Sequence, residues 1–151
     1  METISKFQVE SNVKNLAKIR NFVRKSSYGL GITEEASDDV ILAVDEAATN
    51  IIIHGYKEEQ GMIDIEISKK ANTLIICLHD QAPNFDPTQV HPPDLTLPLE
   101  KRPLGKMGVH LMKSYVDKMI YKKTPEGGNQ LTLIKIVSKT EPERRKNDHK
   151  T

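Results

Sequence analysis

Three polar side chains, those of Glu46, Asn50 and His54, recur every four residues within a largely apolar segment. Residues four apart lie on one edge of an α-helix, so a carboxylate and an amide here can face one ligand. The amide oxygen of Asn50 can complete the octahedral oxygen shell of Mg²⁺, in which phosphate oxygens and water supply the other ligands. The carboxylate of Glu46 can accept a proton from an attacking hydroxyl or water. The alternative is an ordinary amphipathic helix with its polar edge in solvent.

A second candidate is the segment HDQAPNFDP at residues 79–87, where a carboxylate follows an apolar run and the chain then turns. Asp80 in this position can accept a hydrogen bond from an exocyclic amine of a ligand. Asp and Asn beside proline are also common turn residues, so turn chemistry is the alternative, and it is the expected role of Asp86.

A third candidate is the sequence GKMG at residues 105–108, at the start of a predicted helix. Glycines there let backbone N–H groups approach phosphates, the helix dipole favours anions, and Lys106 adds a cation. A flexible loop before a helix is the alternative. Neither common phosphate motif is present, because no G-x-x-x-x-G-K-[ST] occurs and the GLG at residues 29–31 lacks a third glycine.

These side chains need regular elements to position them. The clearest is a helix with Thr33 as its predicted N-cap, Glu34 and Glu35 in its first turn, and an end near residues 54–55. Its apolar stripe is wide, which is typical of a helix packed on a sheet. The stripe comprises Val40, Ile41, Val44, Ala47, Ala48, Ile51 and Ile52.

Strand patterns occupy much of the remaining chain. Residues 62–67 alternate strictly and residues 73–79 hold a continuous apolar run, which predicts an antiparallel pair. Residues 118–124 and 130–138 flank a glycine-containing turn and predict a hairpin. The other predicted elements are a strand over residues 3–9, a helix after it and a helix that begins near Gly108.

The order strand, helix, helix, strands, helix, strands does not alternate as a βαβ array would. It predicts an α+β sandwich with helices on one face of the sheet. One domain is expected over residues 1–138, and residues 139–151, which have no large apolar side chain, are expected to form a charged, disordered tail. Residues 83–103 contain six of the eight prolines, which predicts a long loop.

Composition narrows the range of partners. Lys and Arg number 22 against 21 Asp and Glu, so the net charge of +1 gives no argument for binding nucleic acid directly. No apolar stretch approaches the roughly 20 residues that a membrane span needs. The single cysteine, Cys77, cannot form an internal disulfide, which suits a reducing compartment, and we expect a cytoplasmic protein.

In this order and at these separations, the three segments resemble the ATP-binding boxes shared by gyrase, the heat-shock chaperone ATPases, sensor histidine kinases and the mismatch-repair ATPases. The sequences DEAATN at residues 45–50, NFDP at 84–87 and GKMGVH at 105–110 are most similar to those of the bacterial anti-sigma-factor serine/threonine kinases. The likeness spans about residues 4–138 and implies the histidine-kinase-like, or Bergerat-type, ATPase fold. That fold is a two-layer α/β sandwich with a mixed, mainly antiparallel sheet covered by helices on one face.

The resemblance also implies roles for individual residues. Glu46 would be the general base, Asn50 the Mg²⁺ ligand and Asp80 the acceptor for the adenine amine, with ATP and Mg²⁺ as cofactors. The other implied nucleotide contacts, of which the last four form a lid over the phosphates, are His54, Ala82, Asn84, Phe85, Gly105, Lys106, Met107 and Gly108.

Family members phosphorylate a serine or threonine of a small antagonist protein and otherwise hold a sigma factor inactive, often as dimers. The resemblance therefore implies an ATP-dependent protein kinase that regulates transcription, with an antagonist, a sigma factor and a second copy of the chain as partners.

The sequence departs from the family pattern at Ala82, where glycine is usual, and at Asn84, where a further glycine is common in the wider superfamily. A methyl group at position 82 is expected to crowd the base or to demand a negative φ. Two alternatives to a kinase therefore stay open: a partner-binding module without catalysis, in which nucleotide is structural or absent, and an ATPase in another signalling system.

Overall fold

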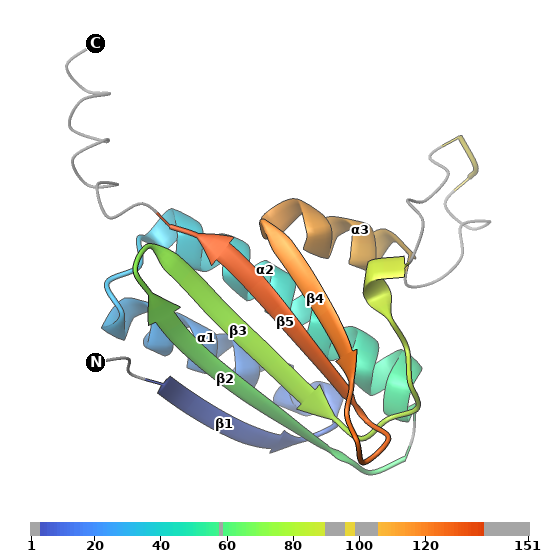
Figure 1. Cartoon of the computed structure of the whole chain (residues 1–151). Coiled ribbons are helices and arrows are strands. Elements are labelled where there is room, and N and C mark those ends of the chain that lie inside the picture. Colours follow the sequence, from blue (N-terminus) through green and yellow to red (C-terminus); the bar gives the residue numbers. More distant parts are fainter. Residues whose placement is uncertain (1–3, 58, 90–95, 99–105, 138–151) are drawn as a thin grey trace, which may run out of the picture.

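The computed structural model describes residues 4–57, 59–89, 96–98 and 106–137 of the 151-residue chain. The N-terminal half of the described chain has one strand followed by helices, and the rest is mostly strand (Figure 1). The elements in chain order are β1 (Ile4–Glu10), η1 (Val13–Asn15), α1 (Leu16–Gly29), α2 (Glu34–Asn50), η2 (Ile51–Tyr56), β2 (Met62–Lys70), β3 (Thr73–Asp80), η3 (Pro87–Gln89), α3 (Lys106–Tyr115), β4 (Lys118–Lys123) and β5 (Asn129–Ile136).

The five strands form one sheet in the order β1-β2-β3-β5-β4. Every neighbouring pair is antiparallel, so the mixed character expected from the sequence does not occur among the described strands. The two predicted pairs, β2 with β3 and β4 with β5, are both present, and β5 joins them by pairing with β3. This insertion places the start of β5 directly beside the end of β3.

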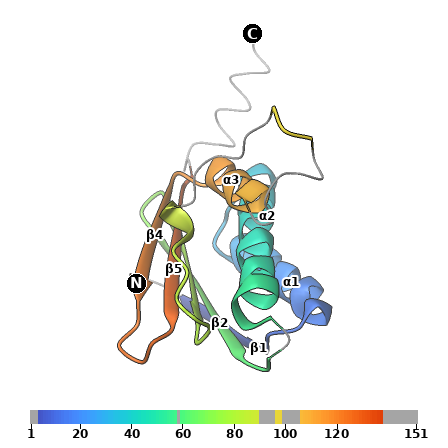
Figure 2. The ribbon, with the colours of Figure 1, turned by 90° about the vertical axis from the view of Figure 1, so that its right-hand side faces the viewer.

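All three α-helices lie on the same side of the sheet, as the view along its edge shows (Figure 2). Burial alternates along β3 because the helices cover only one face of the sheet. On the covered face Leu74, Ile76 and Leu78 are fully buried, and on the opposite face Ile75 and Cys77 are partly exposed. The continuous apolar run of β3 therefore belongs to a half-covered strand. The predicted α+β sandwich with helices on one face is confirmed.

Helix α2 occupies the middle of the helical layer and packs against both α1 and α3. It begins as predicted, since Thr33 Oγ1 accepts a hydrogen bond of 3.3 Å from the backbone N–H of Ala36. Val40 and Val44 are fully buried against the sheet, and each contributes about 1.5–3 kcal/mol of burial energy. Beyond Asn50 the helix continues to Tyr56 as the π-helix η2, a form that is rare and frequent at functional sites.

The C-terminal hairpin closes through a turn in which Gly127 has a φ of +92°, as expected from its glycines. Helix α3 begins at Lys106, two residues before the predicted start, and within the predicted proline-rich loop residues 87–89 form the short helix η3. The predicted tail over residues 139–151 lies outside the described residues. Among those described, no helix is long and apolar enough to cross a membrane.

Candidate active site

A recess that is open to solvent lies between α2, the loop after β3, α3 and the β4–β5 hairpin. Its walls are mainly apolar, with a few polar groups at defined points, which is typical of sites for small organic ligands. The apolar walls include Ile51, Phe85, Pro87, Met112 and Leu131.

Asp80, the last residue of β3, supplies a carboxyl group in the wall of this recess. The residue is only 5% exposed, and Oδ1 accepts hydrogen bonds from the backbone N–H of Ala82 at 2.9 Å and from Asn129 Nδ2 at 2.8 Å. Burial raises the pKa of the Asp80 carboxyl, and the two hydrogen bonds lower it in part. A buried carboxylate with one oxygen already satisfied can accept from a ligand amine through the other.

Glu46 and Asn50 lie one turn apart on α2 and approach the same point on α3. A Cβ atom built on Gly108 would lie 2.6 Å from Glu46 Oε2 and 4.0 Å from Asn50 Oδ1. The Asn50 Nδ2 atom is buried and has no hydrogen-bond partner among the described residues. A buried amide without a partner, next to a carboxylate and a bare glycine backbone, is a suitable environment for a hydrated cation and phosphate oxygens.

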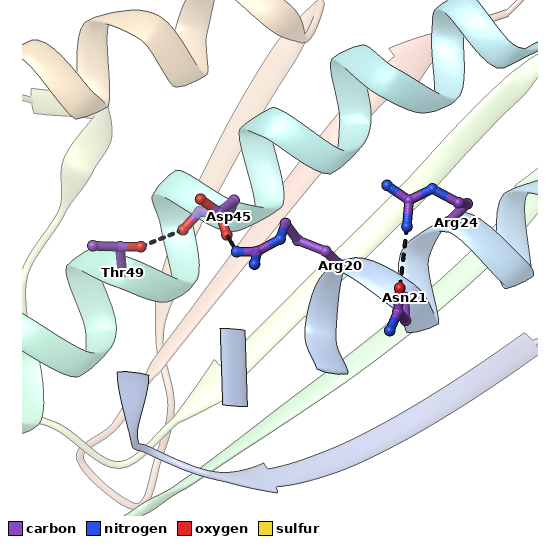
Figure 3. Close-up of polar contacts among 5 residues, drawn as sticks. All are labelled: Arg20, Asn21, Arg24, Asp45 and Thr49. Atoms are coloured by element: carbon purple, nitrogen blue, oxygen red, sulfur yellow. Dashed lines mark hydrogen bonds and ion pairs between the residues drawn. The ribbon is translucent and has the colours of Figure 1, made fainter. Parts of the chain in front are cut away.

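The environment of Glu46 raises the pKa of its carboxyl, chiefly through burial and in addition through the negative charge of Asp45. Asp45 in turn pairs with Arg20 of α1, whose Nη1 lies 2.7 Å from Asp45 Oδ1 (Figure 3). A carboxyl group whose pKa is raised toward neutrality is a better general base than an ordinary glutamate.

Comparison with known families bears on this geometry. Residues 9–135 match the family described as the histidine kinase-like ATPase domain. The chain belongs to this family.

Two curated relatives of this histidine kinase-like ATPase domain have informative names. The serine-protein kinase RsbW of Bacillus cereus (strain AH820) is 29% identical over 123 residues, which cover 78% of this chain and 77% of the relative. The anti-sigma F factor of Clostridium kluyveri is 29% identical over 138 residues, covering 91% and 93%. The predicted resemblance to the anti-sigma-factor kinases is thus confirmed, and so, at the level of the family, is the predicted enzyme class of serine/threonine protein kinase.

Among solved structures, the RsbU and RsbW domains of Rv1364c from Mycobacterium tuberculosis superpose with a TM-score of 0.64 at 15% sequence identity. The match covers 91% of this chain and 33% of that longer one. At this identity the likeness supports the fold of the ATPase domain and nothing finer.

Ala82 does not strain the backbone of this ATPase domain. The only described non-glycine residues with positive φ are Lys57 and Ala71, so Ala82 adopts the negative φ that an L-residue prefers. Its methyl group faces Gly55, where a Cβ atom would lie 3.0 Å from it. The absence of a side chain at Gly55 therefore compensates for the methyl group at position 82.

Two predicted contacts lie away from the recess. His54 is exposed, because the wider turns of the π-helix shift it off the edge that carries Glu46 and Asn50, and Gly55 lines the recess instead. Asn84 donates to the backbone oxygens of Gly127 and Gly128, so it braces the loop against the hairpin.

The predicted lid is described only in part. Gly105 lies outside the described residues, Lys106 and Met107 form the first residues of α3, and Gly108 follows them in its first turn. Of these, Gly108 is brought directly against the carboxylate of Glu46.

Sequence reasoning missed Tyr121, Asn129 and Met112, all of which line the recess. Asn129 follows two glycines and has the signature of a turn residue, and Tyr121 alternates within a strand as any half-buried aromatic residue does. No local signal distinguishes Tyr121 and Asn129, because their place at the site depends on the insertion of β5 beside β3. Met112 reads as an ordinary apolar core position of α3.

Proposed function

We propose that this chain is a cytoplasmic protein kinase that uses Mg²⁺ and ATP to phosphorylate a serine or threonine of a small antagonist protein. The proposal rests on one observation: Glu46 and Asn50 approach Gly108 beside an apolar recess that has Asp80 in its wall. The arrangement combines four groups within one site: a general base, an oxygen ligand for a metal, a glycine that lets other groups approach closely, and a hydrogen-bond acceptor for the amino group of adenine.

The apolar recess suits a purine ring, and Asp80 suits its amino group. Ile51, Met112 and Leu131 supply flat apolar contacts, while the buried carboxylate supplies the directional one. A carboxylate accepts from the exocyclic amine of adenine but would repel the carbonyl oxygen that guanine carries at that position.

Asn50 would hold Mg²⁺ through its amide oxygen, and the metal, when bound, would neutralise charge on the phosphates of ATP. Within the chain itself, Gly108 leaves the space over Glu46 open, because a side chain there would collide with the carboxylate. The acceptor hydroxyl can thus approach Glu46, which takes its proton as the phosphoryl group is transferred.

The proposed partners are the antagonist that carries the acceptor hydroxyl and a sigma factor that the protein holds inactive. The names of the relatives, serine-protein kinase and anti-sigma F factor, support both. Neither the φ of Ala82 nor its packing on Gly55 supports the alternative of a module that has lost catalysis.

The sheet face opposite the helices is a candidate surface for a homodimer. Ile75 and Ile134 are paired there across β3 and β5, and Ile136 and Ile120 on the same face are 59% and 36% exposed. Such a contiguous apolar surface favours association with a matching copy. Sedimentation of Ile136→Glu protein is expected to show monomers where the unmodified chain forms dimers.

Two measurements test the proposed function. Calorimetry should detect binding of ATP that depends on Mg²⁺, and Asp80→Asn should weaken it by roughly 10- to 100-fold, the usual effect of losing a hydrogen bond to a charged acceptor. Transfer of labelled phosphate to a candidate antagonist, with Glu46→Gln protein as control, should require Glu46. Equal labelling by both proteins would refute the kinase, and phosphate release without any antagonist would favour an ATPase.

A further inference from the structure

Asn129 lies directly opposite Asp80 in the sheet, since the two residues are register partners across β3 and β5. Asn129 is only 7% exposed, and it lines the same recess as Asp80. A buried primary amide has four hydrogen-bonding positions to satisfy, so its contacts reveal how it is oriented.

The two ends of this amide meet opposite kinds of group. Among the described residues, Nδ2 faces only acceptors, namely Asp80 Oδ1 at 2.8 Å, the backbone oxygen of Ala82 at 3.1 Å and that of Pro83 at 3.3 Å. Within the same part of the chain, Oδ1 faces only donors, namely the hydroxyl of Tyr121, the backbone N–H of Phe85 at 3.2 Å and Asn84 Nδ2 at 3.5 Å. A flipped amide would set acceptor against acceptor and donor against donor, so a single orientation is stable.

This orientation determines what Asp80 presents to a ligand. Asp80 Oδ1 is occupied by Asn129 and by the backbone N–H of Ala82, whereas Oδ2 accepts no hydrogen bond from the described residues. Burial raises the pKa of Asp80, and the hydrogen bond from Asn129 is the foremost influence that lowers it. The other titratable groups close to this carboxylate are His79, Tyr56 and Tyr121.

We infer that Asn129 is a positioning residue for base recognition: it holds the Asp80 carboxylate in one rotamer with one oxygen free for an exocyclic amine, and Tyr121 holds the Asn129 amide. The inference rests on the proposed adenine nucleotide site and goes further, because it assigns selectivity for the base to two residues outside the predicted site. Neither residue need touch the ligand for this effect.

Comparison of ATP with inosine triphosphate tests the inference, because the inosine compound has a carbonyl oxygen in place of the amine and the same phosphates. The unmodified protein should prefer ATP by roughly 10- to 100-fold. In Asn129→Asp protein a second carboxyl group replaces the amide whose Nδ2 lies 2.8 Å from Asp80 Oδ1, so the two carboxyl groups share one proton. A protonated Asp at position 129 still donates to Asp80, so the preference for ATP should persist near pH 6 and fall toward unity by about pH 8.

Two further variants keep the test decisive. Gln130→Glu makes the same chemical change one residue away, on the uncovered face of the sheet, and should leave the preference intact. Tyr121→Phe removes one donor to the Asn129 amide and should lower the preference several-fold with little change in affinity for inosine triphosphate. This variant decides the matter if Asn129→Asp protein does not fold.

The outcomes separate the inference from the function on which it rests. Failure of the unmodified protein to bind either nucleotide would remove the proposed function and the inference together. A preference for ATP that survives at about pH 8 in Asn129→Asp protein and also in Tyr121→Phe protein, or an equal loss of affinity for both nucleotides, would leave the function standing and overturn the role of Asn129.

Discussion

Gly108 of α3 lies against the carboxylate of Glu46 of α2, so closely that a methyl group on Gly108 would come within 2.6 Å of Oε2. Residues 62 positions apart in sequence thus share one contact at the site of proposed proton transfer. The contact explains why a glycine is needed inside a helix, where it is intrinsically unfavourable by about 1 kcal/mol relative to alanine.

Gly108→Ala should therefore separate stability from activity. The variant protein should be as stable as the unmodified one or slightly more so, whereas displacement of the Glu46 carboxylate should slow phosphoryl transfer by roughly 100-fold. Thermal unfolding and a single-turnover transfer assay measure the two effects. Gly29→Ala is the matched control, because a methyl group there meets nothing within 4 Å, and normal transfer by the Gly108 variant would contradict the assignment.

Glu46→Gln should slow phosphoryl transfer by roughly 10²- to 10⁴-fold, while the affinity for ATP stays within a few-fold of that of the unmodified protein. Burial and Asp45 raise the pKa of Glu46, so its ionised form is disfavoured in the folded protein. The stability linked to this group is fully present below its unfolded pKa and lost as pH rises through the folded value. The variant should consequently be at least as stable as the unmodified protein at neutral pH, with a smaller difference in acid. Denaturant titrations at neutral and acidic pH measure this difference in stability. A variant that is less stable than the unmodified protein at neutral pH would contradict the raised pKa of Glu46.

Gly55→Ala should weaken nucleotide binding, because the new methyl group would lie 3.0 Å from that of Ala82 in the wall of the recess. Overpacking of this kind costs about 1–3 kcal/mol, or roughly 5- to 100-fold in affinity. Adding Ala82→Gly should restore much of the loss, since it removes the colliding atom. Calorimetry on the four proteins of this double-mutant cycle measures the coupling, and additive effects would show that the two positions do not compensate.

Arg20→Ala should shift the acidic limb of the pH–rate profile upward. Loss of the 2.7 Å ion pair leaves the negative charge of Asp45 unbalanced beside Glu46, so the base ionises less readily. The pair is partly exposed, which limits the shift to less than about one pH unit and makes it smaller at high salt. Arg24→Ala is the control, because Arg24 bonds to Asn21 within α1 (Figure 3). Identical profiles for both variants would argue against the electrostatic effect.

Several features of this protein are local and could be predicted without the fold. Thr33 with Glu34 and Glu35 marks the start of α2, and strict alternation marks β2, because capping and period-two burial act over a few residues. The spacing of Glu46 and Asn50 likewise follows from helical geometry alone. Together with Asp80, Gly105 and Gly108, these positions were sufficient to predict the family.

Other features depend on contacts between distant segments. The insertion of β5 between β3 and β4 sets Asn129 against Asp80, and it makes the pair that joins the two hairpins antiparallel. Because the helix changes from α to π after Asn50, His54 is exposed to solvent and Gly55 lines the recess. No local pattern encodes these results, because the register between strands and the phase of a helix end are determined by the packing of the whole core. The sequence alone therefore determined which residues are proposed as the proton acceptor and the metal ligand, because their spacing is local, and the tertiary structure decided which residues orient the group proposed to recognise the base.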